Sequence, residues 1–296
     1  MRFDYPEIDP IIFSFSVGNL ELALRWYALS YILGILVAWK LMQNLSKYSS
    51  LWPNSLAPIR PSAVEDLMTY MILGIILGGR IGYVVFYQPV YYLYNPEDIL
   101  KVWNGGMSFH GGFLGVVFGA LLYGKKKKSN LLSLGDLIAI ASPPGLFFGR
   151  LANFINGELW GKPTTSSWGI VFPARDAKLC PSSWVGECTR HPSQLYEAFS
   201  EGLLLWVMML ICVFWFKSFK RRGETMFIFL TGYGLSRAII EIFREPDAQF
   251  ISTANPNGHL IFISETIGLS MGQILCLPMI IIGVMSLLLT RFYKTK

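Results

Sequence analysis

Long apolar segments alternate with short polar or basic segments along the chain, and most are near the ~20 residues that a helix needs to cross a bilayer. This pattern predicts an all-α polytopic membrane protein with seven transmembrane helices in one domain. The predicted helices occupy residues 20–42, 64–87, 107–123, 131–155, 195–216, 226–243 and 261–289. The fourth is expected to be broken by Pro143, Pro144 and Gly145, because a helix interrupted at membrane depth needs protein or water partners for its freed backbone groups.

The composition excludes an ordinary soluble domain, since 53% of the residues are hydrophobic and only 15% are charged. The net charge of +6 does not indicate a nucleic-acid partner, because the basic residues gather in short segments between apolar ones. The segments after the first, third, fifth and seventh predicted helices hold most of the Lys and Arg. The positive-inside rule therefore predicts an outside N-terminus and a cytoplasmic C-terminus.

Three segments outside the predicted helices refine this topology. The lysine run at 125–128 is interpreted as part of the orientation signal, with recruitment of anionic lipid as the alternative. The first twenty residues lack the basic and apolar regions of a cleavable signal peptide, so the first helix is expected to act as the signal. Residues 157–193 form the longest outward segment, a small arm with a short strand expected within residues 166–173.

The four cysteines fall into two groups. Cys212 and Cys276 lie in apolar segments and are interpreted as core residues. Cys180 and Cys188 lie in the outward segment, where an oxidising compartment would permit a disulfide, but the sequence leaves the pairing open. No group of residues has metal-ligand spacing, so neither a metal nor a cofactor is expected.

The strongest candidate site is the stretch from Gly149 to Gly161, where Arg150, Asn153 and Glu158 enter an apolar region. An ionised side chain in hydrocarbon is costly and usually faces a partner or a wet cavity, so the stretch is a functional-site candidate. On a helix, Arg150 and Asn153 would share one polar face. The alternative is a helix end at which Arg150 and Glu158 reach toward the interface and pair.

A second charged group strengthens this hypothesis. Arg237 and Glu241 are four residues apart and Tyr233 lies one turn earlier, so all three share one helical face. Alone they would equally suit an ion pair that fixes helix packing. Together with Arg150 they favour an anionic group bound at bilayer depth, because guanidinium groups match phosphate geometry. His110, before a glycine pair, is either a general base or a hydrogen-bonded structural histidine.

Four blocks carry a resemblance to a known family: HGGFLG from His110, GRLANFINGELWG from Gly149, RHPSQLYEA from Arg190 and YGLSRAIIEIFREPDAQ from Tyr233. They resemble the signature blocks of bacterial phosphatidylglycerol-prolipoprotein diacylglyceryl transferases, and the similarity begins at RWYALSYILG from Arg25. The resemblance implies an inner-membrane enzyme that moves the diacylglyceryl group of phosphatidylglycerol to the lipobox cysteine of a prolipoprotein and releases glycerol 1-phosphate. Its partners would be phosphatidylglycerol, lipobox peptides and membrane lipids.

The resemblance also implies roles for single residues. Arg150 matches the family's phosphatidylglycerol-binding arginine and Arg237 its second important arginine. The other positions implied to be needed for activity are Tyr27, His110, Asn153, Glu158, Gly161, Tyr233 and Glu241.

A division of roles follows as a hypothesis. The thiolate is the nucleophile, so the thiol needs a base, for which His110 is the first candidate and Glu241 the alternative. Arg150 and Arg237 would stabilise charge on the leaving phosphate, held by Glu158 and Glu241. Asn153 and Tyr27 would donate hydrogen bonds to the lipid head.

A secondary transporter of an anionic solute is the main rival, because such carriers also combine broken helices with charges near the midplane. Many carriers are built from internal repeats, and no repeat relates the two halves of this chain.

Overall fold

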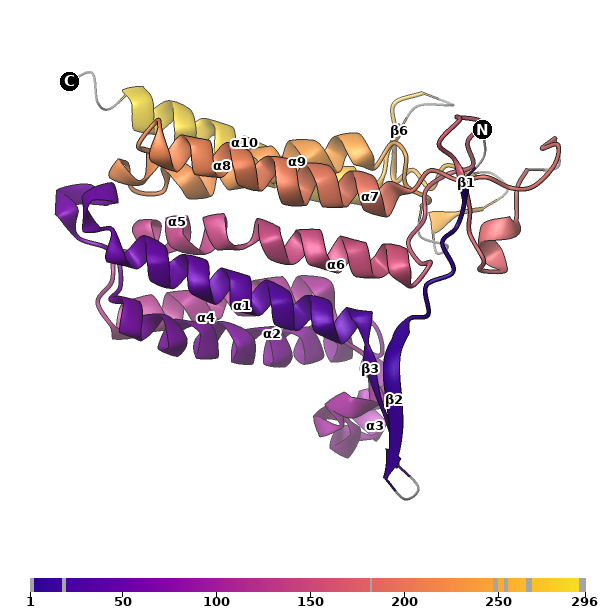
Figure 1. The fold of residues 1–296 in the computed structure, drawn as a ribbon, viewed down its shortest axis with the longest axis horizontal. Helices are drawn as coiled ribbons and strands as arrows, with labels where there is room; N and C mark the ends of the chain where they lie inside the picture. Colours follow the sequence, from indigo (N-terminus) through magenta and orange to yellow (C-terminus); the bar gives the residue numbers. More distant parts are fainter. Residues whose placement is uncertain are drawn as a thin grey trace. The chain divides into compact units, whose positions relative to one another are not determined.

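The computed structural model describes residues 3–17, 20–181, 183–246, 250–252, 255–264 and 268–292 (Figure 1). The chain is mostly helical and divides into two compact units, residues 1–38 with 139–296, and residues 39–138. Among the described residues, five helical stretches are long and apolar enough to cross a membrane: Trp26–Lys47, Pro61–Phe86, Leu131–Ile155, Ser193–Phe214 and Met271–Thr290. The chain is therefore a polytopic membrane protein.

The larger unit contains the helices that carry most of the expected site residues. They are α1 (Trp26–Lys47), which begins in this unit, α6 (Pro143–Ile155), α7 (Ser193–Glu197), a π-helix (Ala198–Leu204), α8 (Leu205–Phe214), α9 (Glu224–Ile240) and α10 (Met271–Phe292). The expected fourth helix is interrupted at Ser142, between α5 (Leu131–Ala141) and α6. Pro143 is the first residue of α6, a position that needs no backbone donor.

Close helix contacts in this unit depend on glycine. A Cβ atom at Gly202, in the π-helix, would lie 2.6 Å from the Cβ atom of Phe147 in α6. A Cβ atom at Gly283 in α10 would lie 2.3 Å from Thr231 Oγ1 in α9. These glycines therefore let the π-helix approach α6, and let α9 and α10 run side by side (Figure 1).

Two predicted helices begin later than expected. The first, expected from residue 20, is preceded by β3 (Leu20–Arg25), which pairs antiparallel with β2 (Ile11–Val17). The sequence LELALR has a leucine at every second position, which is the period of a strand, and the Trp26 amide donates to Pro10 O at 3.2 Å where the hairpin passes into α1.

The seventh helix, expected from residue 261, begins at Met271. Here β5 (Ile261–Phe262) pairs antiparallel with β6 (Gly268–Leu269). Ser270 Oγ accepts from the Gln273 amide at 3.3 Å, and Gln273 Oε1 accepts from the Ser270 amide at 3.1 Å. This reciprocal cap fixes the start of α10 after the hairpin.

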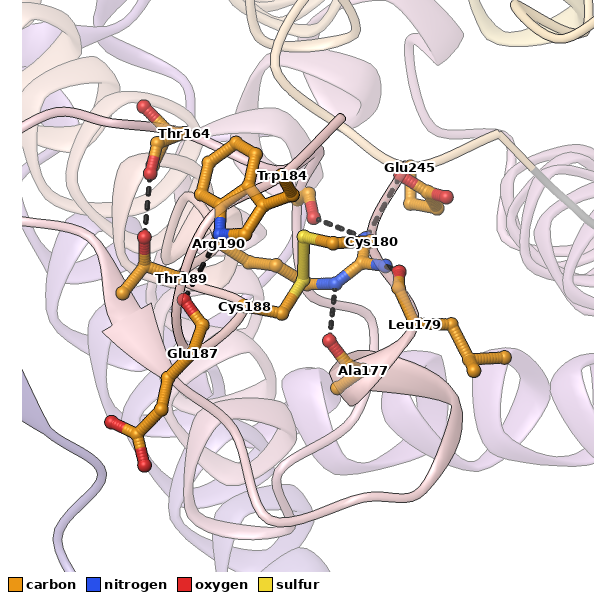
Figure 2. The surroundings of a disulfide bond; sticks show 11 residues. Thr164, Ala177, Leu179, Cys180, Trp184, Glu187, Cys188, Thr189, Arg190 and Glu245 are labelled. Atoms are coloured by element: carbon orange, nitrogen blue, oxygen red, sulfur yellow. Dashed lines mark hydrogen bonds and ion pairs between the residues drawn. A yellow bond between two sulfur atoms is a disulfide. The ribbon is translucent and has the colours of Figure 1, made fainter. Parts of the chain in front are cut away.

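The segment 157–193 contains β4 (Ile170–Val171), within the expected strand region, paired in parallel with β1 (Phe3–Asp4). Cys180 and Cys188 form a disulfide, which settles the pairing that the sequence left open (Figure 2). Short 3-10 helices complete the described elements, at Ser49–Leu51, Pro53–Ser55, Pro61–Ala63, Pro96–Leu100, Val102–Asn104, Asp176–Lys178 and Ser218–Lys220.

The smaller unit is built around α2 (Val64–Phe86) and α4 (Phe109–Lys126), with α3 (Pro89–Tyr94) between them in sequence. A Cβ atom at Gly115 in α4 would lie 1.9 Å from the Gly74 carbonyl oxygen in α2, so the two backbones are in direct contact. The expected third and sixth membrane helices correspond to α4 and α9, which are not among the five apolar stretches identified above.

Candidate active site

A fully buried carboxylate, Glu197, lies at the centre of the candidate site and pairs with three arginines. Arg150 Nε lies 3.1 Å from Glu197 Oε2, and Arg244 Nη1 lies 2.9 Å from Oε1. Arg237 Nη1 also pairs with Oε1. Arg150 is on α6, Glu197 ends α7, Arg237 is on α9 and Arg244 follows α9, so the cluster joins elements that lie together in the larger unit (Figure 1).

Two further carboxylates border the same arginines. Glu201, in the π-helix, is also fully buried, 3.9 Å from Arg150 Nη2 and 3.8 Å from Arg237 Nη1. Within the described part of the chain neither of its oxygens accepts a hydrogen bond. Glu241 Oε2 lies 3.3 Å from Arg237 Nη2 and 3.7 Å from Arg244 Nε. Glu197 thus holds the arginines most closely, Glu241 lies somewhat farther from them, and Glu201 is the most loosely engaged of the three.

The π-helix has a direct effect on this arrangement. It begins at Ala198, directly after Glu197, and contains Glu201. Its wider turn, together with the close approach to α6 that Gly202 permits, presents both carboxylates to the arginines of two other helices.

The three arginines are more accessible than Glu197 and Glu201, whereas Glu241, at 12% exposure, is about as accessible as the arginines. The side chains of Arg150, Arg237 and Arg244 are 17%, 15% and 11% exposed, whereas those of Glu197 and Glu201 are 0% exposed. Each guanidinium also has more N–H donors than these contacts use. The partly exposed guanidinium groups can therefore offer positively charged N–H donors to an anion. The buried carboxylates hold these guanidinium groups in place.

Glu158 is held by amides, and its expected pairing with Arg150 is replaced by the pairing of Arg150 with Glu197. Glu158 Oε1 accepts from Asn153 Nδ2 at 2.8 Å and from Asn156 Nδ2 at 3.4 Å. The physical reason is that α6 ends at Ile155 and the chain then turns, with Gly157 at φ 62°, so Glu158 leaves the helical face of Arg150. Asn153 Oδ1 remains within 3.5 Å of Arg150 Nη1.

Gly161 contributes to the site through backbone contacts to His191 and Arg244. Its amide donates to His191 O at 2.8 Å, and Gly161 faces Arg244 in an antiparallel β-bridge. An added Cβ atom would lie 2.5 Å from Phe243 O and 2.7 Å from His191 Cβ, so a larger residue would push this segment away. Gly161 thereby helps to fix the backbone that carries Arg244.

An aromatic layer lies beside this backbone. His191 Nδ1 is 3.1 Å from the Tyr196 hydroxyl, and the His191 ring contacts that of Phe243 with centroids 5.2 Å apart. Burial, and secondarily the charge of Lys162, lower the pKa of His191. Protonation of this imidazole is therefore disfavoured, and its ring packs against Tyr196 and Phe243 beside the segment that carries Arg244.

The two expected tyrosines lie in the same unit as the cluster. Tyr233 is partly buried on α9, one turn before Arg237. Tyr27 is on α1 and its ring contacts that of Tyr31, with centroids 5.1 Å apart.

Comparisons with known proteins match this chain over nearly its whole length. The family model for prolipoprotein diacylglyceryl transferase matches residues 10–289. The chain belongs to this family. Proteins named phosphatidylglycerol–prolipoprotein diacylglyceryl transferase are similar to it in Ruegeria pomeroyi, Cereibacter sphaeroides and Rickettsia bellii, with identities of 52%, 49% and 46%, each over 97% of both chains. The family predicted from the four sequence blocks is confirmed.

In this member of the prolipoprotein diacylglyceryl transferase family, the sequence prediction missed Glu197, Glu201 and Arg244. A signal for the glutamates was present, because they lie four residues apart in an apolar helical stretch, as Arg237 and Glu241 do. His110, by contrast, belongs to the smaller unit, where it is exposed on the first turn of α4. Its role as the base of a transferase stays a prediction.

Proposed function

We propose that this chain transfers the diacylglyceryl group of phosphatidylglycerol to the thiol of a lipobox cysteine in a prolipoprotein. A carbon–sulfur bond forms, the bond between the glyceryl carbon and the phosphate oxygen breaks, and glycerol 1-phosphate leaves. The observation that carries the proposal is the cluster of three partly exposed arginines held by the fully buried carboxylate of Glu197. The named activity of the relatives supports transfer over transport of an anionic solute.

The arginines would act mainly on the leaving phosphate. Negative charge grows on the phosphate oxygen as the carbon–oxygen bond breaks, and fixed cations in a site with little water stabilise that charge. Arg150 and Arg237 would bind the phosphate, and Arg244 adds a third guanidinium to the two that the sequence predicted. Because Glu197 and Glu241 already hold these groups, little reorganisation would be needed when the lipid binds.

The remaining predicted residues would shape the surroundings of the lipid head. Asn153 and Glu158 hold each other next to Arg150, which favours one orientation of its donors. Tyr27 and Tyr233 would donate hydrogen bonds to the glycerol or phosphate oxygens. Gly161 would contribute to binding indirectly, through the placement of Arg244.

The general base is assigned to His110, with Glu241 as the alternative. Glu241 pairs with Arg237 and also accepts from Ser270 Oγ at 3.1 Å, which suits a residue that holds Arg237 in place.

We expect His110→Gln to lower transfer about 10²-fold or more and to remove the acidic limb of the pH-rate profile, since that limb reports protonation of the base. Glu241→Gln should lower the rate and keep the limb. Wild-type rates in His110→Gln would eliminate the assignment.

We infer an inner-membrane location with seven spans, an outside N-terminus and a cytoplasmic C-terminus. The two spans beyond the five apolar stretches would be α4 and α9, which pack along α2 and α10 respectively, each within one unit. The disulfide in the outward segment suits an oxidising compartment outside the cytoplasm.

The proposed reaction can be tested with the purified protein, phosphatidylglycerol and a lipobox peptide. We expect the peptide to gain the mass of one diacylglyceryl group through a thioether, with release of an equal amount of glycerol phosphate. A peptide with serine in place of the lipobox cysteine is the matched control and should remain unmodified. An unchanged cysteine peptide under conditions where the protein stays folded would contradict the proposal.

A further inference from the structure

Arg190 is a buried cation outside the arginine cluster, and its guanidinium is enclosed by the outward segment. The residue is 3% exposed. Its Nε donates to Ala177 O at 2.7 Å and its Nη2 donates to Leu179 O at 2.6 Å (Figure 2). Its Nη1 donates to Gly161 O at 3.2 Å and pairs with Glu245 Oε2 at 3.0 Å. One side chain therefore ties residues 177–179 and Gly161, which both lie within residues 157–193, to Glu245, which follows α9.

The disulfide closes the segment that supplies the carbonyl acceptors. Leu179 directly precedes Cys180, and Cys188 lies two residues before Arg190, so the Cys180–Cys188 bond brings both sides of the loop to the guanidinium (Figure 2). The backbone of Arg190 is fixed as well, because it exchanges hydrogen bonds with Ile170 of 2.9 and 3.0 Å. The backbone and the guanidinium of Arg190 are thus both fixed by contacts other than the one with Glu245.

Arg190 is connected to the arginine cluster through two residues that are adjacent in sequence, Glu245 and Arg244. Glu245 reaches Arg190, and the preceding residue, Arg244, reaches Glu197 at 2.9 Å. The partner of Arg244 across the β-bridge is Gly161, whose carbonyl oxygen also accepts from Arg190. Arg190 therefore contacts both the residue after Arg244 and the residue opposite it.

We propose that Arg190 is a positioning residue for the transfer reaction. It holds Glu245, the residue after Arg244, and Gly161, the residue opposite Arg244 in the β-bridge, and the loop closed by Cys180 and Cys188 fixes Arg190. The proposal rests on the proposed function, since the position of Arg244 affects the rate only if the cluster acts on the lipid phosphate. The competing explanation is that Arg190 merely stabilises the outward segment.

A double-mutant cycle between Arg190 and Arg244 separates these explanations. We expect Arg190→Gln to lower kcat for transfer about 10²-fold, because displacing a charged group by about 1 Å costs roughly that factor. In an Arg244→Gln background the same substitution should cause little further loss, since the group that Arg190 positions is already gone. Arg175→Gln, at an exposed arginine of the same segment, is the matched control and should retain wild-type kcat. Losses that multiply independently would overturn the proposal.

A milder variant covers the case in which Arg190→Gln does not fold. Glu245→Gln removes the ion pair but keeps an acceptor and the loop contacts, so we expect about a tenfold loss of kcat in the wild-type background and almost none with Arg244→Gln. The double variant Cys180→Ser, Cys188→Ser should lower kcat in the same Arg244-dependent way. Equal losses in both backgrounds for Glu245→Gln would contradict the proposal.

Hydrogen exchange gives a measurement that does not require activity. The amides of Gly161 and Lys162 donate to His191 O and Phe243 O beside Arg244. We expect them to exchange faster in Glu245→Gln and Arg190→Gln, and at the wild-type rate in Arg175→Gln. If the wild-type protein transferred nothing, the proposed function would be wrong, whereas unchanged exchange at these amides would overturn the positioning role itself.

Discussion

Replacing Glu197 by glutamine is expected to destabilise the folded protein by about 3–5 kcal/mol and to abolish transfer, because a buried carboxylate that neutralises several cations is lost. Arg150, Arg237 and Arg244 all pair with this fully buried side chain. The amide of glutamine has nearly the same shape, so the substitution changes charge with little change in packing. Unfolding of the purified variant in detergent, followed by the transfer assay on the folded fraction, measures both effects.

The matched control for this prediction is Glu201→Gln in the next turn of the same helical stretch. Glu201 is as buried as Glu197, but its nearest arginine nitrogens are 3.8 and 3.9 Å away and, in the described part of the chain, its oxygens accept no hydrogen bond. We expect a clearly smaller loss of stability. If both variants lost the same stability, the arginines would not be organised around Glu197.

The difference between the two glutamates also shows what the sequence could predict. Arg150, Arg237 and Glu241 were identified because an ionised residue in an apolar segment is rare and costly. The same criterion applies to Glu197, yet its importance follows from pairing with residues 47, 40 and 47 positions away, which no local pattern specifies. The sequence can therefore indicate which charges need partners, but the partners themselves depend on tertiary packing.

The helix boundaries have a similar explanation. The average apolarity over a window of residues located α2 (Val64–Phe86) well, because most of its residues are apolar and it begins directly after a proline-containing turn. It placed the starts of α1 and α10 too early, because the adjoining hairpins are also apolar. Alternation in LELALR and the Ser270–Gln273 cap were the local signals that could have corrected both.

The close approach of α6 and the π-helix could not be read from apolarity alone. It depends on Gly202, where any side chain would meet Phe147. This contact places the carboxylates of Glu197 and Glu201 next to Arg150, so a packing detail determines the electrostatics of the site. The sequence contains many glycines in apolar segments, and their individual contacts become clear only when the partner helix is known.

Replacing Arg150 by alanine is expected to lower transfer by about 10²–10³-fold while the protein stays folded. The fold should persist because Glu197 keeps Arg237 and Arg244 as partners. Arg150→Lys is the matched variant: it keeps the charge but loses the planar fork of donors, so it should restore only part of the activity. Rates with phosphatidylglycerol and a lipobox peptide, measured beside thermal unfolding, give both results. Undiminished transfer in Arg150→Ala would mean that Arg150 serves only to neutralise the buried carboxylates, and that the phosphate is bound elsewhere.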